Sequence, residues 1–187
     1  MILFVLAYAA DLIFGDPEWM PHPVRWIGRL ISFTEEKLRR PADSGRLARL
    51  KGIALVGIVV GATMFCAWFF ITLMRSVHPV LGDISWIYAA YTALAVKDLR
   101  VKAREVYRAL QKGDLHAARN ELSKIVGRDT DRLDEEGITK AAVESVAEST
   151  SDGIIAPLLY LIIGGPVLAL GYKAVNTLDS MVGHRDE

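Results

Sequence analysis

The sequence predicts an all-α, polytopic membrane protein with transmembrane helices and a cytoplasmic helical segment. Of its 187 residues, 52% are hydrophobic and the mean hydropathy is +0.27, which is too apolar for an ordinary soluble domain. An uncharged run from Gly52 to Leu73 is long enough to cross a hydrocarbon core of about 30 Å. Because 24% of the residues are charged, a substantial polar portion is also expected. The formal net charge is zero, so nucleic acid is not an expected partner.

We divide the chain into four segments of one domain. Residues 1–51 form an N-terminal membrane-associated segment with a proline-rich loop, and residues 52–96 form a transmembrane hairpin. Residues 97–153 form a cytoplasmic helical region with a carboxylate motif. Residues 154–187 form a kinked or re-entrant membrane segment followed by a polar motif.

The first segment begins with an apolar stretch, Met1 to Gly15, whose single charged residue is Asp11. It lacks a basic n-region, so we expect a membrane-inserted or interfacial helix rather than a cleaved signal peptide. Asp11 lies either at the lipid headgroups or in a site. Three prolines between residues 17 and 23 then fix a rigid loop. This loop either presents Asp16, His22 and Arg25 to an anion or substrate, or is a turn at the membrane edge.

The hairpin pairs the Gly52–Leu73 helix with a second helix from Ile84 to Val96, which Pro79 and Gly82 keep from extending backward. Basic residues precede and follow the hairpin, so the positive-inside rule predicts that both flanks are cytoplasmic. The lone cysteine, Cys66, is predicted to be a small buried hydrophobic residue.

The polar region is predicted to contain three helices. Asp98–Gln111 has helical composition, Gly113 and Asp114 form a stop and a new N-cap, and Leu115–Val126 continues as a second helix. Thr130 or Asp131 is expected to cap a third helix, which includes Ile138–Ser149.

Four charged residues on this third helix recur every four positions: Lys140, Glu144, Glu148 and Asp152. Residues at this spacing share a helix face. One interpretation is an ion pair between Lys140 and Glu144 that is worth a few tenths of a kcal/mol. The other is a row of oxygen ligands for a hard divalent cation such as Mg²⁺, bound together with substrate phosphates.

The segment Ile154–Tyr172 is uncharged but interrupted by Pro157 and by Gly164-Gly165-Pro166. It either spans the membrane with a kink or re-enters, and a return requires protein to cover the broken backbone. A return would bring Asn176, Asp179 and His184 to the same side as Glu148.

Several motifs together resemble the membrane-bound adenosylcobinamide-phosphate synthase family of cobalamin biosynthesis. The motifs that carry the resemblance are Asp11–Pro17, Pro21–Gly28, Gly127–Thr130, Lys140–Glu148, Thr150–Pro157 and Lys173–Arg185. Ser149 departs from the family pattern, which usually has Asn there. Members of the family also continue beyond Glu187, so we expect a C-terminally truncated chain.

The resemblance implies an ATP-dependent ligase that joins a corrinoid carboxylate to aminopropanol or its phosphate, with ATP and Mg²⁺ as cofactors. The implied setting is the multi-pass plasma membrane of a bacterial or archaeal cell, where the lipid bilayer and other enzymes of cobalamin assembly are candidate partners. The alternative is a non-catalytic transporter component or sensor related to the family.

Spacing and resemblance together give three groups of predicted site residues. The catalytic group is Lys140, Glu144, Glu148 and His184. The substrate- and phosphate-binding group is Asp16, His22, Arg25, Arg128, Asp129, Lys173, Asn176 and Arg185. The metal-binding group is Glu148, Asp152 and Asp179.

Overall fold

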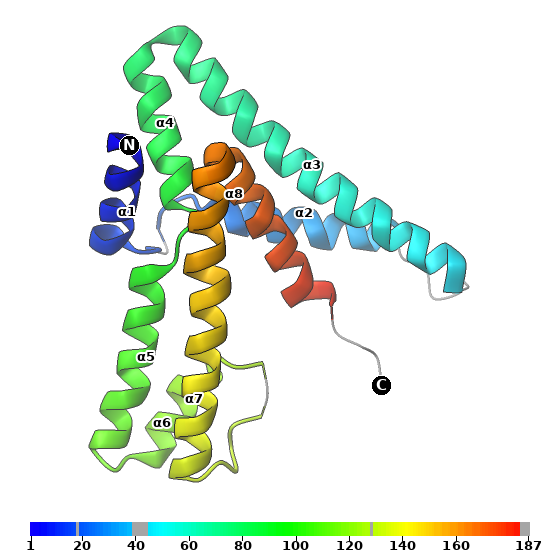
Figure 1. The fold of residues 1–187 in the computed structure, drawn as a ribbon. Helices are drawn as coiled ribbons and strands as arrows, with labels where there is room; N and C mark the ends of the chain where they lie inside the picture. Colours follow the sequence, from blue (N-terminus) through cyan, green and yellow to red (C-terminus); the bar gives the residue numbers. More distant parts are fainter. Residues whose placement is uncertain (18, 39–44, 128, 184–187) are drawn as a thin grey trace.

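The computed structural model describes residues 1–17, 19–38, 45–127 and 129–183, and these residues are helical and contain no β-strand (Figure 1). The predicted all-α class is therefore confirmed. The upper part of the molecule in Figure 1 contains helices α1 (Ile2–Phe14), α3 (Gly45–Val77), α4 (Pro79–Tyr91) and α8 (Ala156–Val182). The polar lobe below it contains α5 (Val96–Gln111), α6 (Leu115–Ser123) and α7 (Glu135–Thr150). Three helical segments, Gly45–Val77, Pro79–Gln111 and Glu135–Val182, are long and apolar enough to cross a membrane.

The predicted hairpin consists of α3 (Gly45–Val77) and α4 (Pro79–Tyr91), which pack against each other. Pro79 was expected to block this second helix, but it occupies its first turn, where the missing N–H costs nothing. His78 caps the helix, because its Nδ1 accepts a hydrogen bond from the Val80 N–H at 3.2 Å. Gly82 packs so closely on α3 that an added Cβ would lie 2.6 Å from the Cβ of Arg75.

Helix α3 has a wide apolar surface that protein does not cover. Phe65, Trp68 and Phe69 are exposed along it. Cys66 is exposed as well, so the prediction that it is buried was wrong. Lipid is as apolar as a protein core, and composition therefore does not distinguish the lipid-facing side of a membrane helix from its packed side.

The polar lobe consists of α5 (Val96–Gln111), α6 (Leu115–Ser123) and α7 (Glu135–Thr150), which pack around buried Val106, Leu122 and Ile138. Asp114 caps α6 as predicted, because its carboxylate accepts from the Ala117 N–H at 2.9 Å. The prediction for the start of α7 was wrong. Asp134 is the N-cap and accepts from the Gly137 N–H at 2.8 Å, and the Thr130 hydroxyl instead donates to the Arg119 carbonyl.

Helix α7 continues through a π-helical turn, η1 (Ser151–Ile155), into α8 (Ala156–Val182). Helix α8 breaks at Gly164 and Gly165, and Pro166 follows. Gly165 has φ +68°, which a residue with a side chain rarely adopts. The chain turns back at this break, so that an outgoing and a returning arm lie beside each other (Figure 1). Ile154–Tyr172 therefore contains the turn that the re-entrant alternative requires.

Protein covers one side of this break. The Cβ position of Gly165 lies 3.5 Å from the indole nitrogen of Trp86 on α4, and Pro166 is buried. This is the cover that a broken backbone at membrane depth needs.

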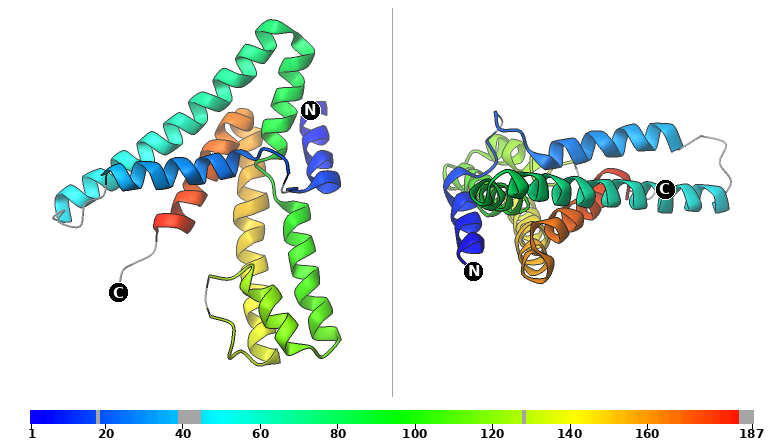
Figure 2. Two further views of the ribbon diagram at one scale, coloured as in Figure 1. Left: turned by 180° about the vertical axis from the view of Figure 1, so that it is seen from behind. Right: turned by 90° about the horizontal axis from the view of Figure 1, so that it is seen from above.

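The two N-terminal helices pack against the helices of the upper part, and α1 also contacts the polar lobe. Helix α1 (Ile2–Phe14) packs on α4 and on the start of α5, and α2 (Pro23–Leu38) packs on α3 and α8. Figure 2 shows α2 extending to the same side of the molecule as α3 and converging on the N-terminal end of α3. Ile27 and Ile31 of α2 are buried against Ala174 and Leu178 of the returning arm.

Candidate functional site

A polar cavity of about 590 Å³ lies where the polar lobe meets the returning arm of α8. Its walls come from the first turns of α5, the end of α6 and the loop after it, the junction of α7 with η1, and the returning arm. The lining combines acidic, basic and small polar side chains, including Asp98, Glu148, Asp152, Asp179, Lys102, Lys124, Lys173, Ser145, Ser149, Asn176 and Ser180.

The return of α8 brings the two predicted polar motifs together. Asn176 and Asp179 line the same cavity as Glu148 and Asp152. The Asn176 amide donates to the Asp152 carbonyl at 3.4 Å, and the Tyr172 hydroxyl donates to Oδ1 of Asp152 at 3.3 Å. A straight span would have separated these groups by the thickness of a bilayer, so the helix break creates the site.

Lys173 is the central cation of this cavity. Its side chain is half-buried, and four carboxylates lie within electrostatic range of its ammonium: Asp16, Asp11, Asp98 and Asp152. Within the described part of the chain, none of them approaches the ammonium to ion-pair distance. By contrast, Lys102 pairs with Asp98 at 2.8 Å and Lys124 pairs with Glu121 at 2.6 Å. Lys173 is therefore the lysine best placed to receive an anionic ligand.

The polar residues predicted on the N-terminal loop, Asp16, His22 and Arg25, do not line this cavity. Nε2 of His22 lies 3.0 Å from Oδ1 of Asp16, and Nδ1 of His22 faces the Val24 N–H at 3.4 Å. His22 is buried, and both of its nitrogens have protein neighbours. Arg25 is exposed and reaches the Pro17 carbonyl at 3.5 Å. The structure thus brings Asp16 near Lys173 but makes His22 part of the loop's own framework.

Asp11 was expected at the lipid headgroups or in a site, but it is a buried helix cap that does not line the cavity. It is fully buried, and its Oδ2 accepts from the Val96 N–H at 2.9 Å. In return, Lys97 donates to the Ile13 carbonyl at 2.6 Å. The end of α1 and the start of α5 therefore cap each other. Because the first turns of α5 carry Asp98 and Lys102, this reciprocal cap sets one wall of the cavity.

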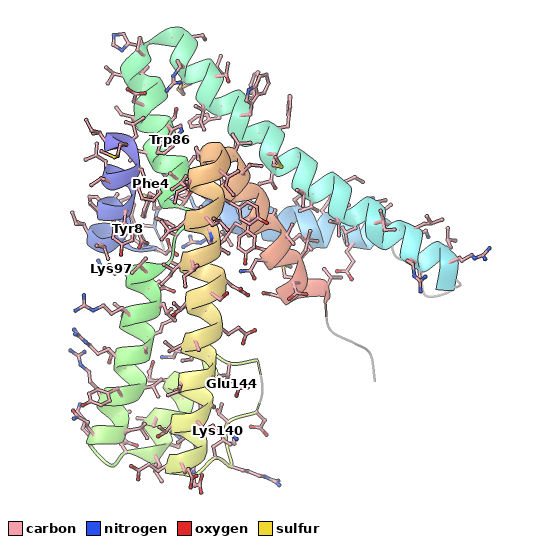
Figure 3. All side chains as sticks on the ribbon, viewed as in Figure 1. Phe4, Tyr8, Trp86, Lys97, Lys140 and Glu144 are labelled. Carbon is pink, nitrogen blue, oxygen red and sulfur yellow. The ribbon has the colours of Figure 1, made fainter. Side chains whose placement is uncertain are left out.

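The structure places Glu144 outside the cavity that Glu148 lines. Glu144 and Lys140 line a separate hollow with Glu135 and Glu136. Figure 3 shows both on α7, below the returning arm of α8. Four residues cover about 400° of an α-helix, so a row at that spacing rotates by about 40° per step. Glu144 also lies one helical turn from Glu148 toward the N-terminal end of α7, farther from the junction with η1.

Of the remaining predicted residues, the structure describes Asp129. Asp129 is exposed, and its carboxylate accepts from the Asp131 N–H at 2.9 Å. Arg128, His184 and Arg185 lie outside the described residues.

The donor set of the cavity fits a phosphate-bearing ligand better than a metal ion held by protein alone. Within the described residues, no group of three or more His, Cys, Asp or Glu side chains is arranged to hold a metal. The predicted trio Glu148, Asp152 and Asp179 therefore does not form a preassembled metal centre. Mg²⁺ commonly takes one or two carboxylates and completes its shell with substrate phosphates and water. The carboxylates and Lys173 fit that arrangement.

The sequence analysis missed several residues of the site. Asp98, Lys102, Lys124 and Tyr172 belonged to none of the three predicted groups of site residues. No sequence signal would have found them, because only the packing of the helices brings Asp98, Lys102 and Lys124 to the cavity and Tyr172 to Asp152.

Fold and site together define a helical membrane protein with a re-entrant hairpin and a polar cavity at its base. The family model described as "CobD/Cbib protein" matches residues 4–187, and the chain belongs to this family. It is 48% identical to the cobalamin biosynthesis protein CbiB of Salmonella arizonae and 47% identical to the cobalamin biosynthesis protein CobD of Klebsiella pneumoniae, over its whole length in both cases. It is also 48% identical to CobD of Photorhabdus laumondii over 97% of the chain.

The chain spans 59% of the length of the first two relatives and 57% of the third. No solved structure matches it.

Proposed function

We propose that the protein catalyses ATP-dependent amide formation in cobalamin biosynthesis, joining the carboxylate of adenosylcobyric acid to aminopropanol or its phosphate. Membership of the CobD/CbiB family supports the pathway, because relatives at 46–48% identity are named cobalamin biosynthesis proteins. The observation that carries the proposal for this chain is Lys173, a half-buried cation among carboxylates in a polar cavity.

In this proposal the basic and the acidic residues of the cavity bind different parts of the ligand. Lys173, with Lys102 and Lys124 at the rim, binds phosphate oxygens. Glu148 and Asp152 offer oxygen ligands to a hard cation. ATP with Mg²⁺, when bound, supplies the activation of the substrate carboxylate. The cavity volume of about 590 Å³ is in the range of small-molecule sites, so the bulky corrinoid extends beyond it.

The position of the cavity supports an enzyme over a transporter component or sensor. Its walls include α5 and the loop after α6, which belong to the polar lobe. A solute path would instead be lined by the membrane helices alone. We further propose that the protein lies in the plasma membrane of a bacterial or archaeal cell with the polar lobe in the cytoplasm, where ATP is available. Other membrane enzymes of cobalamin assembly are its proposed partners.

The test is amide formation by membranes that contain the complete gene product, supplied with a corrinoid acid, an amino-alcohol phosphate, ATP and Mg²⁺. Glu148→Gln keeps the shape of the side chain and removes its charge, and turnover should fall at least about tenfold. Glu144→Gln makes the same change one turn away, outside the cavity, and should keep turnover within about twofold. A wild-type protein that forms no amide, or a Glu148→Gln variant with normal turnover and Mg²⁺ dependence, would contradict the proposal.

A further inference from the structure

The π-helical turn η1 lies where the long helix passes the cavity. It covers Ser151–Ile155 and includes Asp152. A π turn adds a residue to the helical ladder, changes the direction of the side chains that follow, and is frequent at functional sites. The aim of the Asp152 carboxylate therefore depends on what holds this turn.

Two residues of the returning arm hold it. Tyr172 and Asn176 are four residues apart on one helix, so they lie on the same face. The Tyr172 hydroxyl donates to the Asp152 carboxylate at 3.3 Å, and the Asn176 amide donates to the Asp152 backbone carbonyl at 3.4 Å. Both distances are at the long end for hydrogen bonds. Neither bond fixes Asp152 strongly, but together they hold its main chain and its side chain.

The outgoing arm supports this contact through a ring stack. Tyr160 and Tyr172 lie with ring centroids 5.0 Å apart and planes 20° apart. Offset stacking at this distance is favourable and limits rotation of both rings. The stack therefore fixes the Tyr172 ring, and with it the direction from which the hydroxyl reaches Asp152.

We propose that Tyr172 and Asn176 are positioning residues that set the Asp152 carboxylate for its cation. The inference rests on the proposed function, and it changes the predicted role of Asn176 from binding phosphate to holding the π turn. Tyr172 uses Oδ1 of Asp152, which leaves Oδ2 as the oxygen for the ligand. Hydrogen bonds that orient a ligating carboxylate typically affect metal affinity about 10- to 100-fold.

The experiment measures binding of Mn²⁺ together with a non-hydrolysable ATP analogue, by electron paramagnetic resonance of the purified complete gene product. Mn²⁺ accepts the same oxygen ligands as Mg²⁺. Tyr172→Phe removes one oxygen and keeps the ring stack. It should weaken Mn²⁺ binding about tenfold, at the lower end of the range because the bond is long. Asn176→Leu removes the amide donor at similar volume and should act in the same direction.

Tyr160→Phe is the matched control. It removes the same oxygen from the other ring of the stack, and Mn²⁺ affinity should stay within about twofold of wild type. The inference is overturned if Tyr172→Phe and Tyr160→Phe bind Mn²⁺ equally well, or if the wild-type protein binds no Mn²⁺ with the analogue. A wild-type protein that binds Mn²⁺ and the ATP analogue but forms no amide would refute the proposed function alone. The Mn²⁺ affinities of Tyr172→Phe and Tyr160→Phe would still decide the role of Tyr172.

Discussion

The reciprocal cap between α1 and α5 gives a prediction whose magnitude can be worked from the structure. Helix α5 has no side-chain cap from its own N-cap residue, Ala95. Asp11 supplies that cap from a helix 85 residues away in the chain. Asp11→Ala removes the acceptor and leaves the Val96 N–H without its partner.

Loss of an N-cap costs about 1 kcal/mol, and a buried donor left unpaired costs about 1–3 kcal/mol. Both describe the same lost bond, so we expect a total of about 1–3 kcal/mol. In a protein of this size, about 1 kcal/mol shifts the melting midpoint by about 2–4 °C. Asp11→Ala should therefore lower the midpoint by about 2–12 °C. Asp11→Asn keeps a side-chain oxygen for the same bond and should lose less than half as much.

The assay is the fraction of detergent-solubilised protein that stays monodisperse after heating. Hydrogen exchange reports whether the effect is local, and exchange in the first turn of α5 should be faster in Asp11→Ala than in Asp11→Asn. Asp114→Ala is the control, because it removes an exposed cap from α6 and should leave exchange in α5 unchanged. If Asp11→Ala stays within about 1 °C of wild type, or if Asp11→Asn is equally destabilising, the capping argument is wrong.

Two further predictions concern the turn in α8 and the side of the membrane on which the polar lobe lies. Gly165→Ala places a Cβ on a residue with φ +68° and should destabilise the re-entrant turn by about 1 kcal/mol or more. An unchanged melting midpoint would show that the turn tolerates the side chain. Gly61→Ala is the control, because an added Cβ there meets open space. Lys112→Cys, in a Cys66→Ala background, should resist membrane-impermeant thiol reagents in intact cells and react after the cells are opened. Ready labelling from outside would place the polar lobe on the outer side of the membrane and contradict the proposed topology.

The sequence determined the class of the protein and much of its local structure. Uncharged length predicted α3, and the Gly113-Asp114 pair predicted the turn into α6, because these signals act between residues close in the chain. Where local signals were ambiguous, prediction failed. Pro79 is compatible with both breaking and beginning a helix, and Cys66 sits in a run that gives no sign of which side meets lipid.

Both the sequence and the tertiary structure were needed to identify the residues of the site. Sequence motifs named Glu148, Asp152, Lys173, Asn176 and Asp179, which the structure brings around one cavity. Spacing alone also included Glu144, because a row at four-residue intervals looks like one face until its rotation along the helix is followed.

Only the tertiary structure decided that the cavity exists. Gly164-Gly165-Pro166 permits a turn or a kink with equal ease, since glycine allows many backbone angles and proline removes a helix donor. The return of α8 requires cover for its broken backbone, and Trp86 on α4, 79 residues earlier than Gly165 in the chain, lies against it. Contacts over that sequence distance leave no local pattern, so the residues of the motifs could be named from the sequence while their meeting point could not.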